Sequence, residues 1–225
     1  MEDEIEELAR SVEKDGGTIS WKNNSDGTTS PYEINANYFD ALHAPGERIE
    51  VDEQVRRFIT AHAILLALRG LPGLYFHSLF GSRGWPEGVL RTGRKRSINR
   101  EKLDLRRLTS ELSDNQSLRA QIFKGIGHLL RARRDAPAFS PLASQHVLQD
   151  GGKIFAFVRG DEGSNDQMLC LHNMSPDAQS FQCDQWKPPK ARAAVVHDVI
   201  SSERVDWGSE AILVLQPFQS MWLTN

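Results

Sequence analysis

Three stretches of the chain place apolar residues at helical spacing. Residues 2–14 carry apolar side chains three and four positions apart in a highly charged segment that ends at a glycine pair. Two longer stretches, 51–68 and 117–134, each present one apolar face, and the second ends in arginines that suit a helix C-terminus. The sequence therefore predicts three amphipathic helices, with Asp52 as the N-cap of the second.

A short apolar and aromatic run follows the second of these stretches. Residues 73–80 show no polar alternation and are bounded by glycine and proline, a pattern typical of a strand buried on both faces. A helix leads directly into this run, and a polar loop rich in glycine and arginine follows it. The sequence thus predicts half of a βα repeat, whose following loop lies on the functional face of a parallel sheet. Residues 18–22 predict a short strand, and residues 23–31 predict a surface loop.

The pattern changes after residue 145. Residues 135–141 contain two prolines and mark the expected domain boundary. Beyond it, strand-like runs alternate with glycine- and aspartate-rich turns, and the expected strands are 146–148, 153–159, 167–172, 193–198, 211–215 and 220–224. This alternation predicts a small antiparallel β domain, a sandwich by preference.

Composition and charge narrow the class of protein. The 225 residues have 39% hydrophobic and 25% charged side chains, which is typical of a globular protein, and a net charge of −3 argues against a nucleic-acid partner. No apolar run reaches membrane-spanning length, and the acidic N-terminus has no signal core, so we expect a cytoplasmic protein without a membrane partner. Cys170 and Cys183 lack partners at metal spacing, so we expect reduced thiols, with a disulfide as the minority alternative, and neither metal nor cofactor.

Three motifs occur in order along the chain. They are TSPYEINANYFDAL, RGLPGLYFHSLFGSR and TGRKRSINREKLDL. Together they resemble the sucrose phosphorylases and their relatives in the α-amylase superfamily, and the tail LVLQPFQSMWL is similar to the closing strand of their C-terminal β domain. The resemblance covers essentially the whole chain. It implies an α/β plus all-β fold, namely the C-terminal part of a (β/α)8 barrel followed by a small antiparallel β-sandwich.

The resemblance also implies a division into three parts. Residues 1–50 resemble an inserted segment that returns to the barrel, residues 51–138 the last helices and strand of an incomplete catalytic barrel, and residues 142–225 the C-terminal β domain. The remainder of the barrel is expected upstream, as a candidate partner. We therefore expect residues 1–135 to be poorly stable or oligomeric without it, and residues 145–225 to fold alone.

Family members act with retention of configuration. A carboxylate attacks the anomeric carbon, a carboxylic acid protonates the leaving group, and phosphate takes the glucosyl unit from the covalent intermediate. By resemblance, the catalytic carboxylates lie upstream of this chain, so no residue here is assigned as catalytic and the chain alone is expected to be inactive. The one His-Asp pair, His197-Asp198, is interpreted as the end of a strand.

The residues expected to recognise acceptor and phosphate lie in two of the motifs. By resemblance, Tyr32 and Glu33 face the acceptor, and Arg96 binds on the acceptor side, because guanidinium groups can bind two phosphate oxygens at once. Arg94 and His77 are further candidates. The alternatives remain open: Tyr32 as a packing residue, His77 as a hydrogen-bonded core histidine, and the loop cations as solvated charges.

The implied function is therefore a part of an enzyme. The chain would contribute acceptor- and phosphate-binding residues to a retaining α-glucosyl phosphorylase, which transfers glucose between a glucoside and phosphate. A non-catalytic carbohydrate- or protein-binding module and a piece of an α-amylase-family hydrolase are the alternatives. Many sucrose phosphorylases have glutamine where this chain has Glu33, which places sucrose in doubt, while sucrose 6-phosphate, glucosylglycerate and glucosylglycerol remain open.

Overall fold

The chain folds into two compact units. The computed structural model describes residues 2–43, 46–148, 152–188, 195–208 and 211–225. The first unit comprises residues 1–54 and 75–123, and the second comprises residues 55–74 and 124–225. The helices and short 3-10 turns are α1 Glu2–Lys14, η1 Asp40–Leu42, α2 Val51–Ala67, η2 Phe76–Phe80, α3 Pro86–Thr92, η3 Lys95–Asn99, α4 Leu105–Ser113, α5 Leu118–Arg134, η4 Pro137–Phe139 and η5 Cys183–Gln185. The strands are β1 Thr18–Asn23, β2 Thr29–Asn35, β3 Gln145–Val147, β4 Ile154–Arg159, β5 Met168–Asn173, β6 Gln179–Gln182, β7 Val195–Asp198, β8 Arg204–Asp206, β9 Ile212–Leu215 and β10 Ser220–Thr224.

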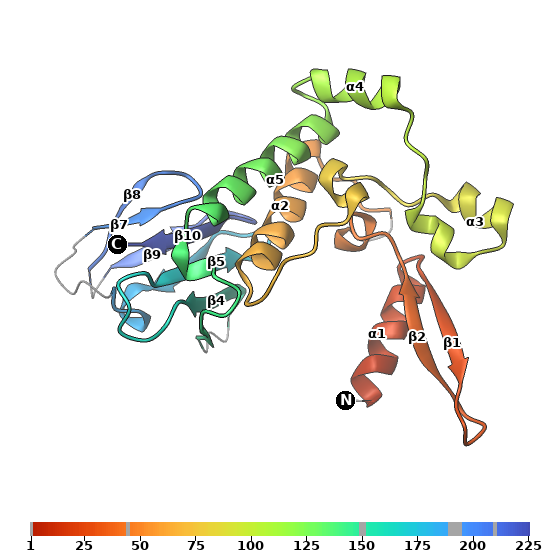
Figure 1. Ribbon diagram of the computed structural model, residues 1–225, viewed down its shortest axis with the longest axis horizontal. Helices are drawn as coiled ribbons and strands as arrows, with labels where there is room; N and C mark the ends of the chain where they lie inside the picture. Colours follow the sequence, from red (N-terminus) through yellow and green to blue (C-terminus); the bar gives the residue numbers. More distant parts are fainter. Residues whose placement is uncertain (1, 44–45, 149–151, 189–194, 209–210) are drawn as a thin grey trace. The chain divides into compact units, whose positions relative to one another are not determined.

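The first unit is built on a helix and a hairpin. Strands β1 and β2 pair antiparallel, with Ile19 opposite Ile34, and α1 lies beside them (Figure 1). Ala9 of α1 and Ile19 of β1 are almost completely buried, whereas the opposite side of α1 is charged. The helix forms as the periodicity predicts, but only part of its apolar stripe is buried, because Ile5 and Leu8 are 48% and 54% exposed.

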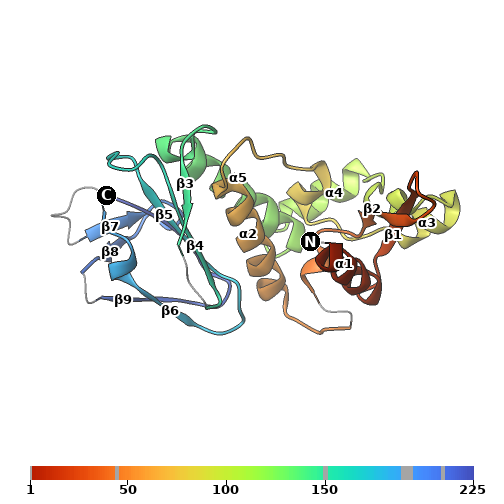
Figure 2. The same cartoon turned by 90° about the horizontal axis from the view of Figure 1, so that it is seen from below.

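The second unit contains an antiparallel sheet with both faces covered. The strand order is β3-β4-β5-β10-β7-β8, and a separate ladder joins β6 to β9. Figure 2 shows the β6-β9 ladder below this sheet, with α2 and α5 against its other face. One core cluster joins Leu171 and Leu223 of the sheet to Phe181 of β6 and Leu215 of β9. The described strands therefore confirm the predicted antiparallel β region.

The opposite face of the sheet packs against the two long helices. This second cluster joins Phe157 and Trp222 of the sheet to Leu66 of α2 and Leu129 of α5, and Trp222 is fully buried. Burying an aromatic side chain of this size contributes about 2–3 kcal/mol. The apolar stripes of α2 and α5 thus cover the face of the sheet that carries Trp222.

Two arginines hold the C-terminal end of α2. Arg159 is 0% exposed and donates from Nη1 to the carbonyl of Ala67 at 2.5 Å and from Nη2 to the carbonyl of Ser140 at 2.8 Å. Arg133 donates to the carbonyls of Leu66 and, at 3.0 Å, Phe139. The last carbonyls of a helix have no partner within the helix, so these guanidinium groups satisfy them.

The strand predicted over residues 73–80 is not formed, and this prediction is wrong. Residues 71–75 have no regular structure, and residues 76–80 form the 3-10 turn η2, which ends at Gly81 in the left-handed region with φ 55°. A parallel strand requires neighbours on its edges, and the described strands pair only antiparallel within their own sheets. The α/β character of the first part is thus not formed within this chain.

The structure also differs from several smaller predictions. Helix α2 begins at Val51, so Asp52 lies in its first turn and is not its N-cap. The predicted loop 23–31 is shorter, because β2 already begins at Thr29. Within the expected long loop after residue 80, the chain forms α3 and η3. Strands β6 and β8 were not expected, and part of the expected strand 193–198 lies outside the described residues.

Candidate functional site

The loop that carries the predicted anion-binding arginines is braced from several sides. Lys95 donates from Nζ to the carbonyl of Ile19 on β1 at 2.7 Å. The backbone N–H of Trp85 donates to the carbonyl of Ile98 at 2.8 Å, and this bond closes the segment that contains α3 and η3. Arg91 lies over the Trp85 ring, 5.7 Å from its centroid. Trp85 is thus a loop anchor in this structure.

Asn99 joins this loop to the end of the hairpin. Its side chain donates to the carbonyl of Ala36 at 2.9 Å and accepts from the side chain of Asn37 at 3.1 Å. The hydroxyl of Tyr75 donates to the carbonyl of Asn99 at 2.7 Å. The three sequence motifs are therefore joined at Asn99 by hydrogen bonds. This bracing gives the arginines between residues 91 and 100 a defined position beside β2.

An ion pair joins Arg96 to Glu33. Arg96 donates from Nε to Oε2 of Glu33 at 2.8 Å, and the two side chains are 52% and 31% exposed. Glu33 lies opposite Ser20 in the hairpin register. Hydrogen bonding and charge from Glu33, with a smaller contribution from Tyr32, raise the pKa of Arg96. The structure thus brings Tyr32, Glu33 and Arg96 together in one cluster.

The cluster opens onto a pocket with a positive lining. The pocket has a volume of about 1000 Å³. It is lined by Ser20, Glu33, Trp85, Arg91, Thr92, Arg94, Lys95, Arg96, Ser97, Arg100, Glu101 and Lys102, that is, by six basic and two acidic side chains. Arg94 belongs to this lining, and its role stays a prediction. Ser20 lies outside the three motifs, and Lys102 lies in the third motif but was not predicted as a site residue. An excess of positive charge over so small a surface favours an anionic ligand.

His77 lies apart from this lining. Its ring is buried, its Nδ1 lies 3.1 Å from Oγ of Ser82, and burial is the main cause of its lowered pKa. Tyr75 and Phe76 flank the ring, with centroids 5.5 and 5.4 Å away. The alternative of a hydrogen-bonded core histidine therefore describes His77 better than a ligand-facing group.

Three further aspartates make structural contacts. Asp40 pairs with Arg83 at 3.1 Å and accepts from the N–H of Gly84 at 2.7 Å. Asp104 caps α4 by accepting from the N–H of Arg107 at 2.8 Å. Asp198 is buried at the end of β7 and accepts from the N–H of Trp222 at 2.9 Å, so the interpretation of His197-Asp198 as a strand end is confirmed.

The described residues contain neither a metal-binding cluster nor a membrane-spanning helix. Within residues 2–43, 46–148, 152–188, 195–208 and 211–225, no group of three His, Cys, Asp or Glu side chains is placed to hold a metal ion. Over the same ranges no helix is both long and apolar enough to span a bilayer. Cys170 and Cys183 are both buried free thiols, and burial raises the pKa of each.

Comparison with known proteins identifies curated relatives. A glucosylglycerate phosphorylase of Escherichia coli is 33% identical over 99% of this chain, which spans 37% of that protein. Another from Spirochaeta thermophila is 39% identical over 76% of this chain and 29% of its own length, and a third from Allomeiothermus silvanus is 33% identical over 99% of this chain. The chain thus spans about a third of the length of the relatives it matches. No protein-family model matches it.

Solved structures of other proteins share the fold of this chain. The sucrose 6F-phosphate phosphorylase of Thermoanaerobacter thermosaccharolyticum matches 76% of this chain and 31% of its own, with a TM-score of 0.55 and 18% identity. An α-amylase of Geobacillus thermoleovorans matches 84% of this chain and 36% of its own, with a TM-score of 0.58 and 14% identity. Together with the curated relatives, these likenesses show that the chain belongs to the sucrose phosphorylase-like enzymes of the α-amylase superfamily, of which it represents the C-terminal portion.

Proposed function

We propose that this chain forms the acceptor and phosphate side of a retaining glycoside phosphorylase, with Arg96 as its main anion-binding group. The observation that carries the proposal is the ion pair of Arg96 with Glu33 at the edge of the basic pocket. Nε of Arg96 is engaged by Glu33, and the same contact orients the guanidinium plane. The remaining N–H groups of a guanidinium so held can bind two oxygens of a carboxylate or phosphate.

The basic lining of the pocket and the names of the relatives together indicate which anion is bound. Three relatives are glucosylglycerate phosphorylases, so we propose glycerate as the acceptor and glucosylglycerate as the glucoside. Glycerate and phosphate are both small anions with hydroxyl groups, and they occupy the acceptor side in succession, one leaving before the other attacks the glucosyl intermediate. Glu33 accepts from an acceptor hydroxyl while Arg96 holds the anionic end.

The catalytic carboxylates would be supplied by the upstream part of a (β/α)8 barrel. In this arrangement α2 and α5 are the last two barrel helices, and the β region is a C-terminal sandwich. A hydrolase admits water as its acceptor and has no need of a basic acceptor pocket. The excess of basic side chains therefore favours phosphorolysis over hydrolysis.

A chimera tests the proposal. This chain replaces the matching 222 residues of the Escherichia coli relative, and phosphate-dependent cleavage of glucosylglycerate is compared with cleavage of sucrose. We expect phosphate dependence and a preference for glucosylglycerate. Arg96→Lys is expected to lower kcat/KM roughly tenfold or more, because lysine cannot make the forked contact.

The matched control is Arg106→Lys on the exposed side of α4. It changes the same chemical group outside the pocket lining and should leave kcat/KM unchanged. An active chimera that cleaves without phosphate would assign the chain to a hydrolase. Equal activity of the Arg96→Lys and parent chimeras would remove Arg96 from the acceptor site.

A further inference from the structure

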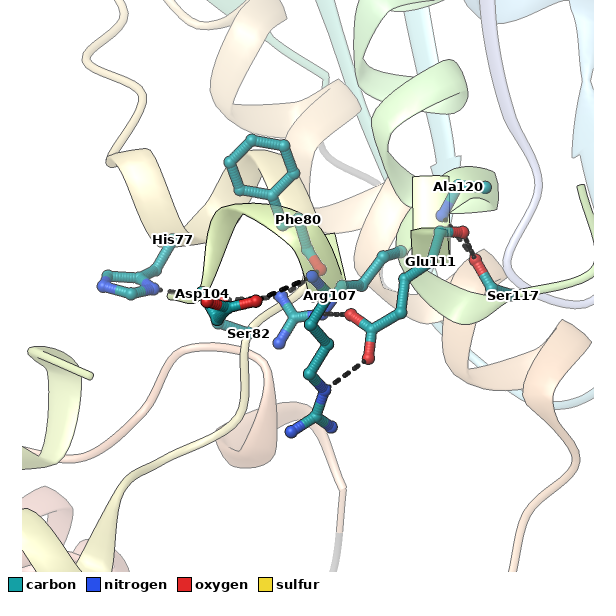
Figure 3. Close-up of polar contacts among 9 residues, drawn as sticks. His77, Phe80, Ser82, Asp104, Arg107, Glu111, Ser117 and Ala120 are labelled. Carbon is teal, nitrogen blue, oxygen red and sulfur yellow. Dashed lines mark hydrogen bonds and ion pairs between the residues drawn. The ribbon is translucent and has the colours of Figure 1, made fainter. Parts of the chain in front are cut away.

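A chain of hydrogen bonds in the first unit joins α4, the first turn of α5 and the segment that follows η2. It leads from Arg107 through Glu111 and Arg119 to Ser82 and His77. Figure 3 labels Arg107, Glu111, Ser82 and His77 of this chain of bonds. Glu111 on α4 accepts from Nε of Arg119 at 2.6 Å and from Nε of Arg107 at 2.9 Å. Arg119, in the first turn of α5, then donates from Nη1 to Oγ of Ser82 at 2.9 Å.

The direction of donation follows from the groups involved. A guanidinium can only donate, so Oγ of Ser82 accepts from Arg119 and has its own proton free for Nδ1 of His77. The ring then carries its proton on Nε2. The backbone of Glu101 hydrogen-bonds to the same ring and favours its charged form, as an accepting carbonyl does. From Arg119 through Ser82 and His77 to Glu101, every donor therefore points the same way, whereas Arg107 and Arg119 both donate to Glu111.

The chain of hydrogen bonds reaches the proposed site at Glu101. Glu101 and Lys102 line the basic pocket of about 1000 Å³, and they also line a second pocket of about 460 Å³ that contains Arg107, Glu111 and Arg119. The segment of Glu101 and Lys102 is thus a wall shared by two cavities. An extended wall between two open spaces has little packing of its own, so its position depends on the bonds made to it.

We propose that Arg119, Ser82 and His77 are positioning residues that fix the Glu101–Lys102 wall of the anion pocket through this one-directional chain of hydrogen bonds. The role of the wall in anion binding rests on the proposed function. The order of donors and its effect on the wall do not. Glu111 completes the arrangement, because its contact holds the Arg119 side chain, only 18% exposed, against Ser82.

Protonation of His77 reverses the direction of its hydrogen bond with Ser82. The charges that act on the ring are those of Glu101, which raises the pKa of His77, and Arg119, which lowers it. The Ser82 hydroxyl and the rings of Tyr75 and Phe76 also face the histidine. Burial outweighs these charges, so the ring is neutral near pH 7. In acid, Nδ1 becomes a donor and Ser82 faces two donors at once. The wall should therefore loosen as His77 takes up its proton.

The first test uses the whole chain labelled with 15N. Long-range 1H–15N spectra should show the proton of His77 on Nε2. Ser82→Ala should shift the amide signals of Glu101 and Lys102, and Ser82→Thr, which keeps the hydroxyl, should restore them. Arg119→Gln should raise the pKa of His77, because it removes a nearby positive charge, while Arg131→Gln, on an exposed position of the same helix, should not.

The second test titrates the same samples with D-glycerate and follows the Nε–H signal of Arg96. Ser82→Ala should weaken binding about three- to tenfold, and Ser82→Thr should bind as the parent does. A proton on Nδ1 of His77, or unmoved amides of Glu101 and Lys102 in Ser82→Ala, would overturn the positioning role. If these signals behave as expected but the parent binds no D-glycerate, the positioning role stands and the proposed function falls.

Discussion

Arg159 is a charged side chain enclosed by protein, with backbone carbonyls as its partners. It donates to the carbonyls of Ala67, Ser140, Ala143 and Ser144, and burial lowers the pKa of its guanidinium. Among the described residues no carboxylate forms an ion pair with it. The hydrogen bonds to these peptide groups offset the cost of burying the guanidinium charge.

Replacing Arg159 should therefore be costly. Arg159→Met keeps the length of the side chain but leaves the carbonyls of Ala67 and Ala143 without the donors they have here. We expect the free energy of unfolding to fall by about 3 kcal/mol. Urea denaturation followed by tryptophan fluorescence measures the change. Arg131→Met, at an exposed position of α5, should change it by less than about 0.5 kcal/mol. Equal stabilities of the two variants would contradict the capping role.

His172 makes the second unit sensitive to acid. It is fully buried on β5, its Nδ1 lies 2.8 Å from Oγ of Ser220, and burial lowers its pKa from 6.5 to about 3. The unfolded chain therefore binds this proton more tightly than the folded chain. Stability from this residue is complete above pH 6.5 and is lost as the pH falls towards 3.

The expected slope is about 1.4 kcal/mol per pH unit across this range. Urea denaturation of the second unit at pH 7.5, 6 and 4.5 measures it. His172→Gln cannot take up the proton and should flatten the slope. His146→Gln, at an exposed position of β3, should leave the slope as it is. An unchanged slope in His172→Gln would assign the acid sensitivity to other groups.

At the scale of single elements, α4 depends on its ends. None of its residues is buried, so the helix gains little from packing. Its stability comes from the Asp104 cap and from the ion pair of Glu111 with Arg107, four residues apart. Helix α5 differs, because its face carrying Ile122, Ile126 and Leu129 is buried.

Removing the cap should loosen α4 selectively. Asp104→Ala is expected to cost the helix about 1 kcal/mol, which corresponds to roughly fivefold faster amide exchange in its first two turns. Asp104→Asn keeps a capping oxygen and should show nearly the parent rates. Hydrogen exchange measured by NMR separates α4 from α5, whose rates should not change. A uniform change in both helices would mean that the substitution acts on the whole unit.

At the scale of the whole molecule, the second unit joins segments distant in the chain. Residues 55–74 precede the β region by about seventy positions, yet α2 supplies Ala63, Leu66 and Ala67 to the core beneath Trp222. The expectation that residues 145–225 fold alone considered only their strands. The structure shows that one face of their sheet is covered by helices outside that range.

A fragment of residues 142–225 should therefore fold poorly. Without α2 and α5, the Trp222 face of the sheet is exposed to water, and an apolar face of this kind favours association. We expect the fragment to bind a hydrophobic dye and to unfold without a sharp transition, whereas the full chain shows a cooperative transition in its second unit. A fragment that is monomeric and melts cooperatively would show that the sheet and the β6-β9 ladder suffice.

Several features followed from the sequence by itself. The helices over 2–14 and 117–134 and most strands after residue 145 were correctly predicted, because a 3.6-residue or two-residue period determines which face an element can bury. The motifs indicated the superfamily and singled out Tyr32, Glu33 and Arg96, which lie together in the structure. Their roles in acceptor recognition stay predictions.

Other features depended on tertiary structure. Residues 73–80 have the composition of a buried strand, but strand formation requires neighbours, and here η2 forms instead. The ladder β6-β9 has little apolar alternation and is stabilised by packing of Phe181 and Leu215 across the core. The donors around His77 and the carbonyls around Arg159 come from segments far apart in the chain. Sequence periodicity reports which face of an element is apolar, whereas hydrogen-bond partners are determined only when distant segments meet.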